Sequence, residues 1–136
     1  MNPPATLLHA LVQQAPDAII YTDCQGIIQI WNRAATDLFG HDAQEVLGQS
    51  LDMIIPENLR KAHWAGFHHA VSTGQAKYAG RVMTSRSCHK NGHPLYVDLS
   101  FSLIRDDSGA VQGVMATGRD VTLEYRQRQL SRKETG

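Results

Sequence analysis

The most constraining feature of the sequence is a stretch of alternating side chains in its C-terminal third. Every second residue of this stretch is apolar: Leu95, Val97, Leu99, Phe101 and Leu103. The residues between them are Tyr96, Asp98, Ser100 and Ser102. Successive side chains of a β-strand point to opposite faces, so the alternation predicts a strand with one buried face. Such a strand requires partner strands at its edges and a second layer over its apolar side.

Turn signals flank this strand on both sides. Asn91-Gly92 predicts a tight hairpin of type I′, in which both central residues take positive φ, after a strand over residues 78–89. Residues 106–109, Asp-Asp-Ser-Gly, predict a second turn, which leads into a last strand over 110–119. The C-terminal half is therefore expected to form a three-stranded antiparallel meander.

An additional hairpin is expected near the N-terminus. Residues 18–22 and 27–31 are apolar and rich in β-formers, and Asp23 to Gly26 between them reads as a turn. Helices are expected in the remaining stretches, at 5–15, 32–40, 42–48, 56–72 and 123–133. Because most of these helices cluster between the second and third strands, they should cover one face of an antiparallel sheet. The sequence thus predicts an α+β fold with room for a ligand between helices and sheet.

The chain reads as one domain with a helical extension at each end. The predicted parts are an N-terminal flanking helix over 1–16, a globular domain over 17–122, and a C-terminal helix or linker over 123–136. Thirteen Lys and Arg residues balance thirteen Asp and Glu residues, which argues against binding to nucleic acid or to an anionic membrane.

The sequence shows none of the motifs that are typical of membrane spans, secretion or the common classes of enzyme. No apolar run approaches the ~18 residues of a membrane span. The first residues, Met-Asn-Pro-Pro, show no basic region ahead of an apolar core, so no secretory signal is expected. Cys24 and Cys88 favour free thiols in a reducing compartment, with a single disulfide between them as the alternative. A cytoplasmic protein is expected. The sequence contains no nucleophile elbow, phosphate loop or kinase motif, so no enzyme activity is expected.

Several short motifs follow one another in a characteristic order over residues 16–122. They are Pro16-Asp17-Ala18-Ile19-Ile20, Trp31-Asn32, Ala34-Ala35, Leu38-Phe39-Gly40, Glu45-Val46-Leu47-Gly48, Ile54-Ile55-Pro56, Lys90-Asn91-Gly92 and Gly118-Arg119-Asp120-Val121-Thr122. In order and spacing they resemble the PAS family of sensory domains. The resemblance implies a PAS fold, with a five-stranded antiparallel sheet, helices over one face and flanking helices at both ends. Members of the family bind haem, flavins, small acids or nothing, so function requires a separate argument.

His63 is the main candidate for a ligand-binding residue. It lies four residues after Leu59 and four before Phe67, on the apolar stripe of its predicted helix. A histidine on such a stripe is either hydrogen-bonded within the protein or ligates a bound group. The segment from Ile55 to His63 is similar to the same helix in haem-binding PAS domains of oxygen-sensing kinases and phosphodiesterases. There the corresponding histidine is the proximal iron ligand, so the resemblance implies b-type haem held by His63.

The resemblance also implies which residues face the other side of the haem. In the oxygen sensors a strand arginine hydrogen-bonds oxygen at the position of Met83, and in one group a methionine ligates iron at the position of Arg81. The two residue types are thus swapped here. Period two places Arg81 and Met83 on one face, which leaves open a ligand Met83, a gas-contacting Arg81, or a core Met83 with Arg81 in solvent. Leu99 and Phe101 match positions that line the distal pocket, and Met115 is expected to join them.

Our first hypothesis is a sensory PAS domain that binds haem b and senses a gas (O2, CO or NO) or redox state. The alternatives are a cofactor-free PAS dimerisation or protein-interaction module, and a PAS domain that binds a small organic ligand or flavin. The apolar stripe Leu7, Leu8, Leu11 and Val12 predicts a homodimer through terminal helices, because burying each leucine is worth about 1.5–3 kcal/mol. The chain is expected to be either an excised sensor module or a small standalone protein that acts on a partner.

Overall fold

The computed structural model of the protein describes residues 2–76 and 81–135 and confirms the α+β fold. The elements follow in the order α1 (Ala5–Gln13), β1 (Ala18–Thr22), β2 (Ile28–Trp31), α2 (Arg33–Phe39), α3 (Ala43–Val46), η1 (Leu51–Ile54), η2 (Glu57–Leu59), α4 (Arg60–Thr73), β3 (Met83–Cys88), β4 (Pro94–Arg105), β5 (Val111–Asp120) and α5 (Thr122–Thr135). The elements labelled η are short 3₁₀ helices.

The strands form one antiparallel sheet in the order β2-β1-β5-β4-β3. The central strand β5 pairs with β1 on one side and β4 on the other, so it joins the N-terminal hairpin to the C-terminal meander. Phe101 of β4 is paired with Ala116 of β5, which is paired with Ile20 of β1. Directly opposed residues share a face of a sheet, so these three side chains point to the same side.

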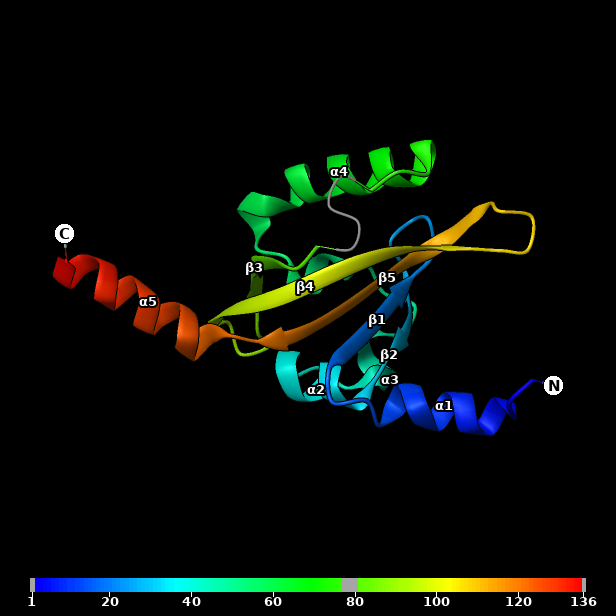
Figure 1. Cartoon of the computed structure of the whole chain (residues 1–136), viewed down its shortest axis with the longest axis horizontal. Coiled ribbons are helices and arrows are strands. Elements are labelled where there is room, and N and C mark those ends of the chain that lie inside the picture. The colour runs from blue at the N-terminus through cyan, green and yellow to red at the C-terminus, as the bar shows by residue number, and fades with distance from the viewer. Residues whose placement is uncertain (1, 77–80, 136) are drawn as a thin grey trace.

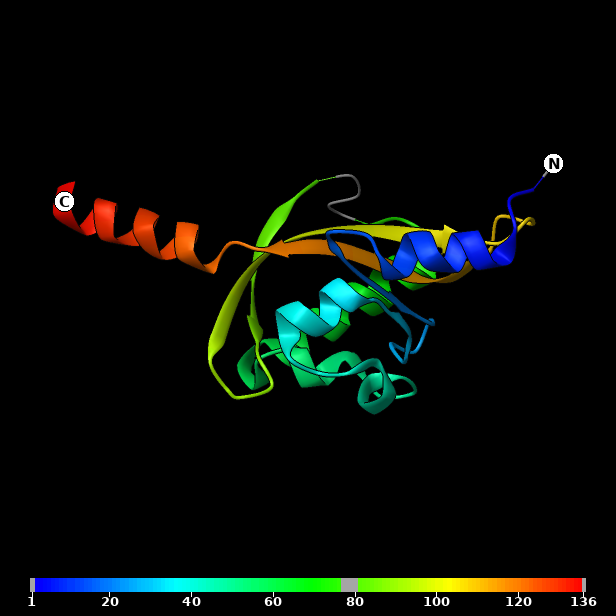
Figure 2. The same cartoon turned by 90° about the horizontal axis from the view of Figure 1, so that it is seen from below.

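Helices α2, α3 and α4 cover this inner face of the sheet, as expected from the sequence (Figure 2). The core lies between the two layers, and its largest fully buried apolar side chains are Trp31, Phe39, Ile28, Val46 and Val97. Helices α1 and α5 extend away from this body at opposite sides of the molecule (Figure 1).

Asn32 connects three elements at the start of α2. Its side chain is fully buried, and its Oδ1 accepts the backbone N–H groups of Ile19 at 2.8 Å and Ala35 at 3.0 Å. Its Nδ2 donates to the carbonyl oxygens of Val12 at 2.9 Å and Asp17 at 3.0 Å. A buried amide without partners would cost about 1–3 kcal/mol. Here the bond from Ala35 caps α2, and the other three bonds tie Asn32 to α1, to β1 and to the segment between them.

The largest differences from the sequence-based expectation concern two elements. The strand expected over 78–89 begins at Met83, where pairing with β4 begins; residues 78–80 lie outside the described residues. The helix expected over 56–72 is divided into η2 and α4. At this division the Leu59 N–H donates to the Pro56 carbonyl at 2.9 Å, which is the i→i−3 bond of a 3₁₀ turn. The Arg60 guanidinium donates to the carbonyl oxygens of Ile55 and Asp52, which precede the helix.

The hairpin between β3 and β4 is confirmed, but its turn is not of type I′. Gly92 has a φ of 93°, and no residue other than glycine has positive φ in the described parts of the chain. The Gly92 N–H donates to the His89 carbonyl at 2.9 Å, and the His89 N–H donates to the His93 carbonyl at 3.0 Å. This pattern is a type I turn closed by a left-handed glycine. The glycine is therefore needed at the closing position of the loop.

Two further expectations concern thiols and membrane spans. Cys24 and Cys88 are both free and half-buried, which confirms the expectation of two thiols. Among the described residues, no helix combines the length and the apolar character needed to cross a membrane.

Candidate functional site

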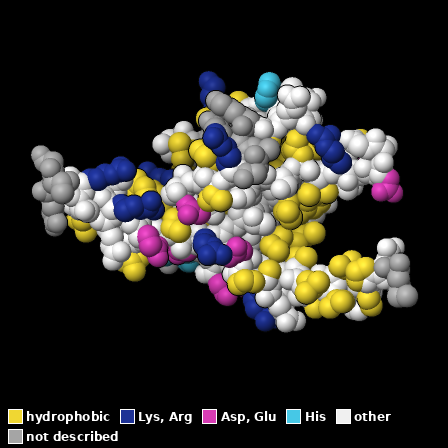
Figure 3. Space-filling view, viewed as in Figure 1, with side chains coloured by type: hydrophobic (Ala, Val, Ile, Leu, Met, Phe, Trp, Pro, Cys, Tyr) yellow, Lys and Arg dark blue, Asp and Glu magenta, His cyan; other side chains and the backbone are white. Residues whose placement is uncertain are grey.

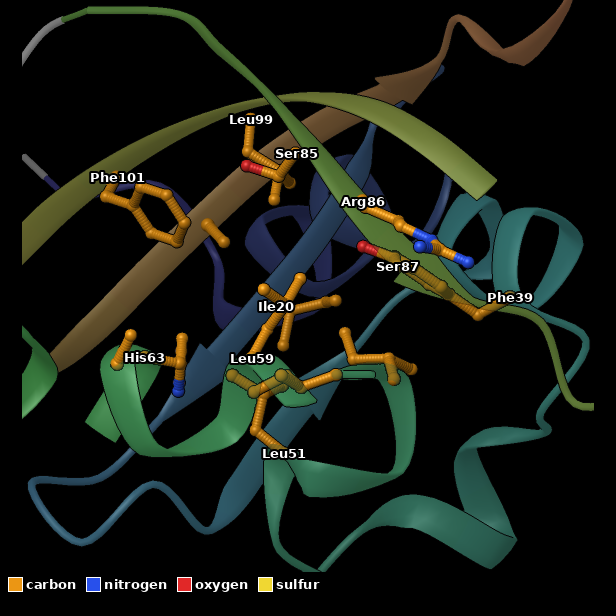
Figure 4. A pocket seen from close by; sticks show the side chains of 14 residues that line it. Ile20, Phe39, Leu51, Leu59, His63, Ser85, Arg86, Ser87, Leu99 and Phe101 are labelled. Carbon is orange, nitrogen blue, oxygen red and sulfur yellow. The ribbon is translucent and has the colours of Figure 1, made fainter. Parts of the chain in front are cut away.

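A cavity of about 400 Å³ lies between the inner face of the sheet and the helices that cover it (Figure 4). This volume falls within the range of about 300–1,000 Å³ that is typical of small-molecule sites. Most of its lining is apolar: Ile20, Phe39, Leu51, Ile54, Ile55, Leu59, Ala62, Leu99, Phe101 and Ala116. The remaining lining residues are His63, Ser85, Arg86 and Ser87.

The register of the sheet explains where this space arises. The central strand β5 contributes only the small Ala116 to the wall, between Phe101 of β4 and Ile20 of β1. Helix α4 and the two 3₁₀ segments form the opposite wall, with Leu51, Leu59 and His63 turned toward the sheet (Figure 4). Because Ala116 is small, it leaves a space at the centre of the sheet, and the helical segments cover this space to form the cavity.

His63 lies in this wall, as expected from its place on the apolar side of α4. Neither ring nitrogen has a hydrogen-bond partner among the described residues, and Nδ1 is fully shielded from solvent. Burial lowers the pKa of His63 below its ordinary value of 6.5, a shift that Asp52 opposes and His68 reinforces. The ring is therefore neutral at neutral pH, which is the form that ligates metals.

Trp64 holds α4 beside the cavity. Its indole nitrogen donates to Oδ1 of Asp52 at 2.6 Å, and its ring stands edge-on to His63 with the centroids 4.6 Å apart. The ring also lies against Gly26, so closely that a Cβ at that position would collide with it. The sequence analysis did not single out Trp64, because its role depends on contacts with distant segments.

Leu99 and Phe101 line the cavity, as expected. The expectation for Met115 requires correction, because the structure places it on the other face of the sheet. Met115 is paired with Ser102 of β4 and Tyr21 of β1, whereas the inner face receives the neighbouring Ala116. The strand alternation was assigned correctly on β4, but its register with β5 could not be read from the sequence.

Arg81 and Met83 do not line the cavity. Met83 is paired with Leu99 and so shares the inner face, yet 37% of its surface is exposed because it stands at the start of an edge strand. Arg81 is exposed and precedes β3, so the alternation of side chains along a strand does not place it on the same face as Met83. The structure thus brings His63 together with Leu99 and Phe101 but not with Arg81 or Met83.

Two residues that the sequence analysis overlooked occupy the β3 wall. Ser85 and Ser87 line the cavity, and both have the same parity as Met83 along the strand. That parity was the available signal, because it places the three side chains on one face. The part of β3 that reaches the cavity lies further along the strand than the family resemblance implied.

The donor chemistry of the site fits a haem. A neutral imidazole with unpaired nitrogens stands in the wall of an apolar cavity, and imidazole is the commonest protein ligand of haem iron in sensors and globins. His63 would be the residue that holds the iron. Met83, the expected second iron ligand, is not in the wall, so a bis-liganded site is not supported by this arrangement.

A family model described as the PAS fold matches residues 6–121. Among curated proteins, the sensor protein FixL of Bradyrhizobium diazoefficiens is 29% identical over 96 residues, which is 69% of this chain and 19% of FixL. The oxygen sensor protein DosP of Escherichia coli is 27% identical over 124 residues, which is 91% of this chain and 15% of DosP. The chain therefore spans less than a fifth of either relative.

Solved structures support the same fold. The crystal structure of the PAS domain of a protein from Colwellia psychrerythraea matches with a TM-score of 0.74 at 23% identity, over 86% of this chain and 96% of that chain. The structure of an RNA-binding light-oxygen-voltage receptor matches with a TM-score of 0.72 at 21% identity, over 99% of this chain and 41% of that chain. At these identities the likeness concerns the fold alone.

Proposed function

Since the chain belongs to the PAS family and is a sensory PAS domain, we propose that it senses a gas or redox state through b-type haem held by His63. The observation that carries the proposal is the neutral, unpaired imidazole of His63 in the wall of an apolar cavity. One relative, DosP, is named an oxygen sensor, which favours a gas as the signal. When bound, haem supplies an iron centre that takes up a diatomic ligand or changes oxidation state.

In this proposal the residues of the chain bind, shield and transmit, and they do not catalyse. Burial keeps the pKa of His63 low, so its nitrogen stays available to a metal at neutral pH. Leu99 and Phe101 give the cavity an apolar wall on the side of β4. A change in the cavity would pass into the sheet, because β1, β4 and β5 each contribute to its wall.

The test is the absorption spectrum of freshly purified protein, supplemented with haem, for the wild type and two variants. His63→Ala should lose the Soret band of bound haem while its far-UV circular dichroism stays unchanged. His68→Ala removes an exposed histidine of the same helix and should retain the band. A His63→Ala protein that keeps stoichiometric haem with an unaltered spectrum would refute the assignment of His63.

We further propose that the chain pairs with a second copy through α1. Leu7, Leu8 and Leu11 are 48%, 49% and 60% exposed, and α1 has no buried residue. Hydrophobic side chains gather along this helix (Figure 3). A self-complementary apolar patch most often forms a two-fold dimer.

A further inference from the structure

We propose that Ser85 and Ser87 of β3 are the hydrogen-bonding groups with which the cavity recognises its ligand, across from His63. The inference rests on the proposed function and extends it. With haem held by His63, these hydroxyls would donate to an acceptor atom of the small ligand that the cavity takes up.

The two hydroxyls have no partner within the protein. Ser87 is only 5% exposed and Ser85 is half-buried, yet neither side chain makes a hydrogen bond to any residue in 2–76 or 81–135. Among the described residues the fully enclosed side-chain atoms without a partner are His41 Nε2 and His63 Nδ1, so the oxygens of both serines keep accessible surface and can meet a molecule in the cavity that they line. Two unpaired hydroxyls in one apolar wall indicate a partner that enters the cavity.

Their position sets them opposite the histidine. Ser85 is paired with Val97 and Ser87 with Leu95, so both share the inner face of the sheet with the cavity-lining Leu99. Figure 4 shows both serines on the β3 side of the cavity and His63 on the α4 side. A ligand with an apolar body, held at His63, would therefore present its far side to the two hydroxyls.

The other candidate side chains on and just before β3 are less suited to contact a ligand in the cavity. Arg86 lies among the lining residues, but its side chain is exposed and its pairing with Tyr96 belongs to the outer face. Arg81 and Met83, the positions suggested by the family resemblance, do not line the cavity. The polar recognition groups are thus Ser85 and Ser87, which lie two and four residues beyond Met83 along β3.

Removal of the hydroxyls should have opposite effects on the empty and the loaded protein. In haem-free protein, Ser87→Ala removes a hydroxyl that has no hydrogen-bond partner among the described residues, so the melting temperature should stay the same or rise. In haem-loaded protein, Ser85→Ala and Ser87→Ala together should speed the release of oxygen by about tenfold, the factor that corresponds to the loss of one or two hydrogen bonds. The infrared stretch of bound carbon monoxide should also shift.

Two further variants serve as controls. Ser87→Thr retains a hydroxyl and should keep the wild-type infrared stretch of bound carbon monoxide. Ser100→Ala removes a serine of β4 that is paired with Thr117 on the outer face, so it should change none of the readouts.

The outcomes separate the two proposals. A melting temperature that falls in haem-free Ser87→Ala, relative to Ser100→Ala, would assign the hydroxyl a structural role and overturn the inference. An unchanged infrared stretch and release rate in the double variant would overturn it while haem binding at His63 stands. A wild-type protein that takes up no haem would overturn the proposed function and this extension together.

Discussion

The rings of Tyr96 in β4 and Tyr125 in α5 stack with their centroids 3.7 Å apart and their planes 13° apart. The backbone is joined at the same place, since the Val121 N–H donates to the Tyr96 carbonyl at 2.8 Å and Thr122 Oγ1 accepts the Tyr96 N–H at 3.0 Å. Leu99, three residues further along β4, lines the cavity. The first turn of the C-terminal helix is thus fixed to a strand that forms part of the ligand site.

Loss of this stack should loosen α5 without unfolding the domain. An aromatic pair contributes about 0.5–1.5 kcal/mol beyond its buried area, so Tyr125→Ala should raise the local opening equilibrium of α5 about two- to tenfold. Hydrogen exchange of the backbone amides of α5 measures this directly. Tyr125→Phe keeps the stack and should exchange like the wild type, as should Arg126→Ala at a neighbouring exposed position. Equal exchange in Tyr125→Ala and Arg126→Ala would show that the stack does not hold the helix.

The contact between Gly26 and Trp64 can be isolated by a matched pair of substitutions. Gly26 and Gly48 have nearly the same backbone, with φ of 80° and 84°. A Cβ at Gly26 would collide with the Trp64 ring, whereas a Cβ at Gly48 would meet no atom within 4 Å. Gly48→Ala should therefore lower the free energy of unfolding by about 1–2 kcal/mol for its left-handed backbone alone.

Gly26→Ala should lower the free energy of unfolding by a further ~1–3 kcal/mol, because the Trp64 ring must move or the backbone must shift. Urea unfolding of both variants gives the difference. If the two variants are equally destabilised, then Trp64 has room to yield and does not fix the position of α4 against the turn between β1 and β2.

Much of the fold followed from local patterns. The alternation over residues 95–103 identified β4 and its buried face, and Asn32 and Gly40 marked the bounds of α2 as its N-cap and left-handed C-cap. These features are set by residues close in sequence, so they can be read without a structure. The prediction of a type I′ turn at Asn91-Gly92 was wrong, because the same dipeptide also fits a type I turn with a closing glycine.

The site was only partly predictable, for a different reason. The inward placement of His63 depends on helix periodicity, and that of Leu99 and Phe101 on strand periodicity. Met115 was misplaced because its face depends on the register between β4 and β5, which no local pattern specifies. Likewise, Ser85 and Ser87 became candidates only when the start of β3 and the shape of the cavity were known.

Acidification should destabilise the protein through two half-buried histidines. Burial lowers the pKa of both His63 and His41 below 6.5, so each stays neutral in the folded state at a pH where the unfolded chain takes up a proton. Below about pH 6.5 the unfolded state binds more protons than the folded state, and stability therefore falls as the pH decreases. Urea unfolding at pH 7.5 and pH 5.5 should show this loss.

The loss should become smaller in His63→Gln and in His41→Gln, because each variant removes one of these protonation differences. His69→Gln, at an exposed position of α4, is the control and should keep the wild-type dependence on pH. If all three variants lose the same stability between the two pH values as the wild type, then the two histidines are not its origin.

The proposed pairing through α1 is best tested by substitution rather than by removal of the helix. The Val12 carbonyl accepts a hydrogen bond from the buried Asn32, so deleting α1 would leave Asn32 short of a partner and destabilise the domain for an unrelated reason. Leu7→Glu combined with Leu11→Glu instead places two charges on the exposed apolar stripe, one helical turn apart.

Light scattering after size exclusion should then give a monomer for this double variant, where the wild type at high micromolar concentration gives a dimer. His9→Glu adds a charge on another side of the same helix and should leave the dimer intact. A monomeric wild type, or a double variant that dimerises as well as the wild type, would rule out α1 as the contact between copies.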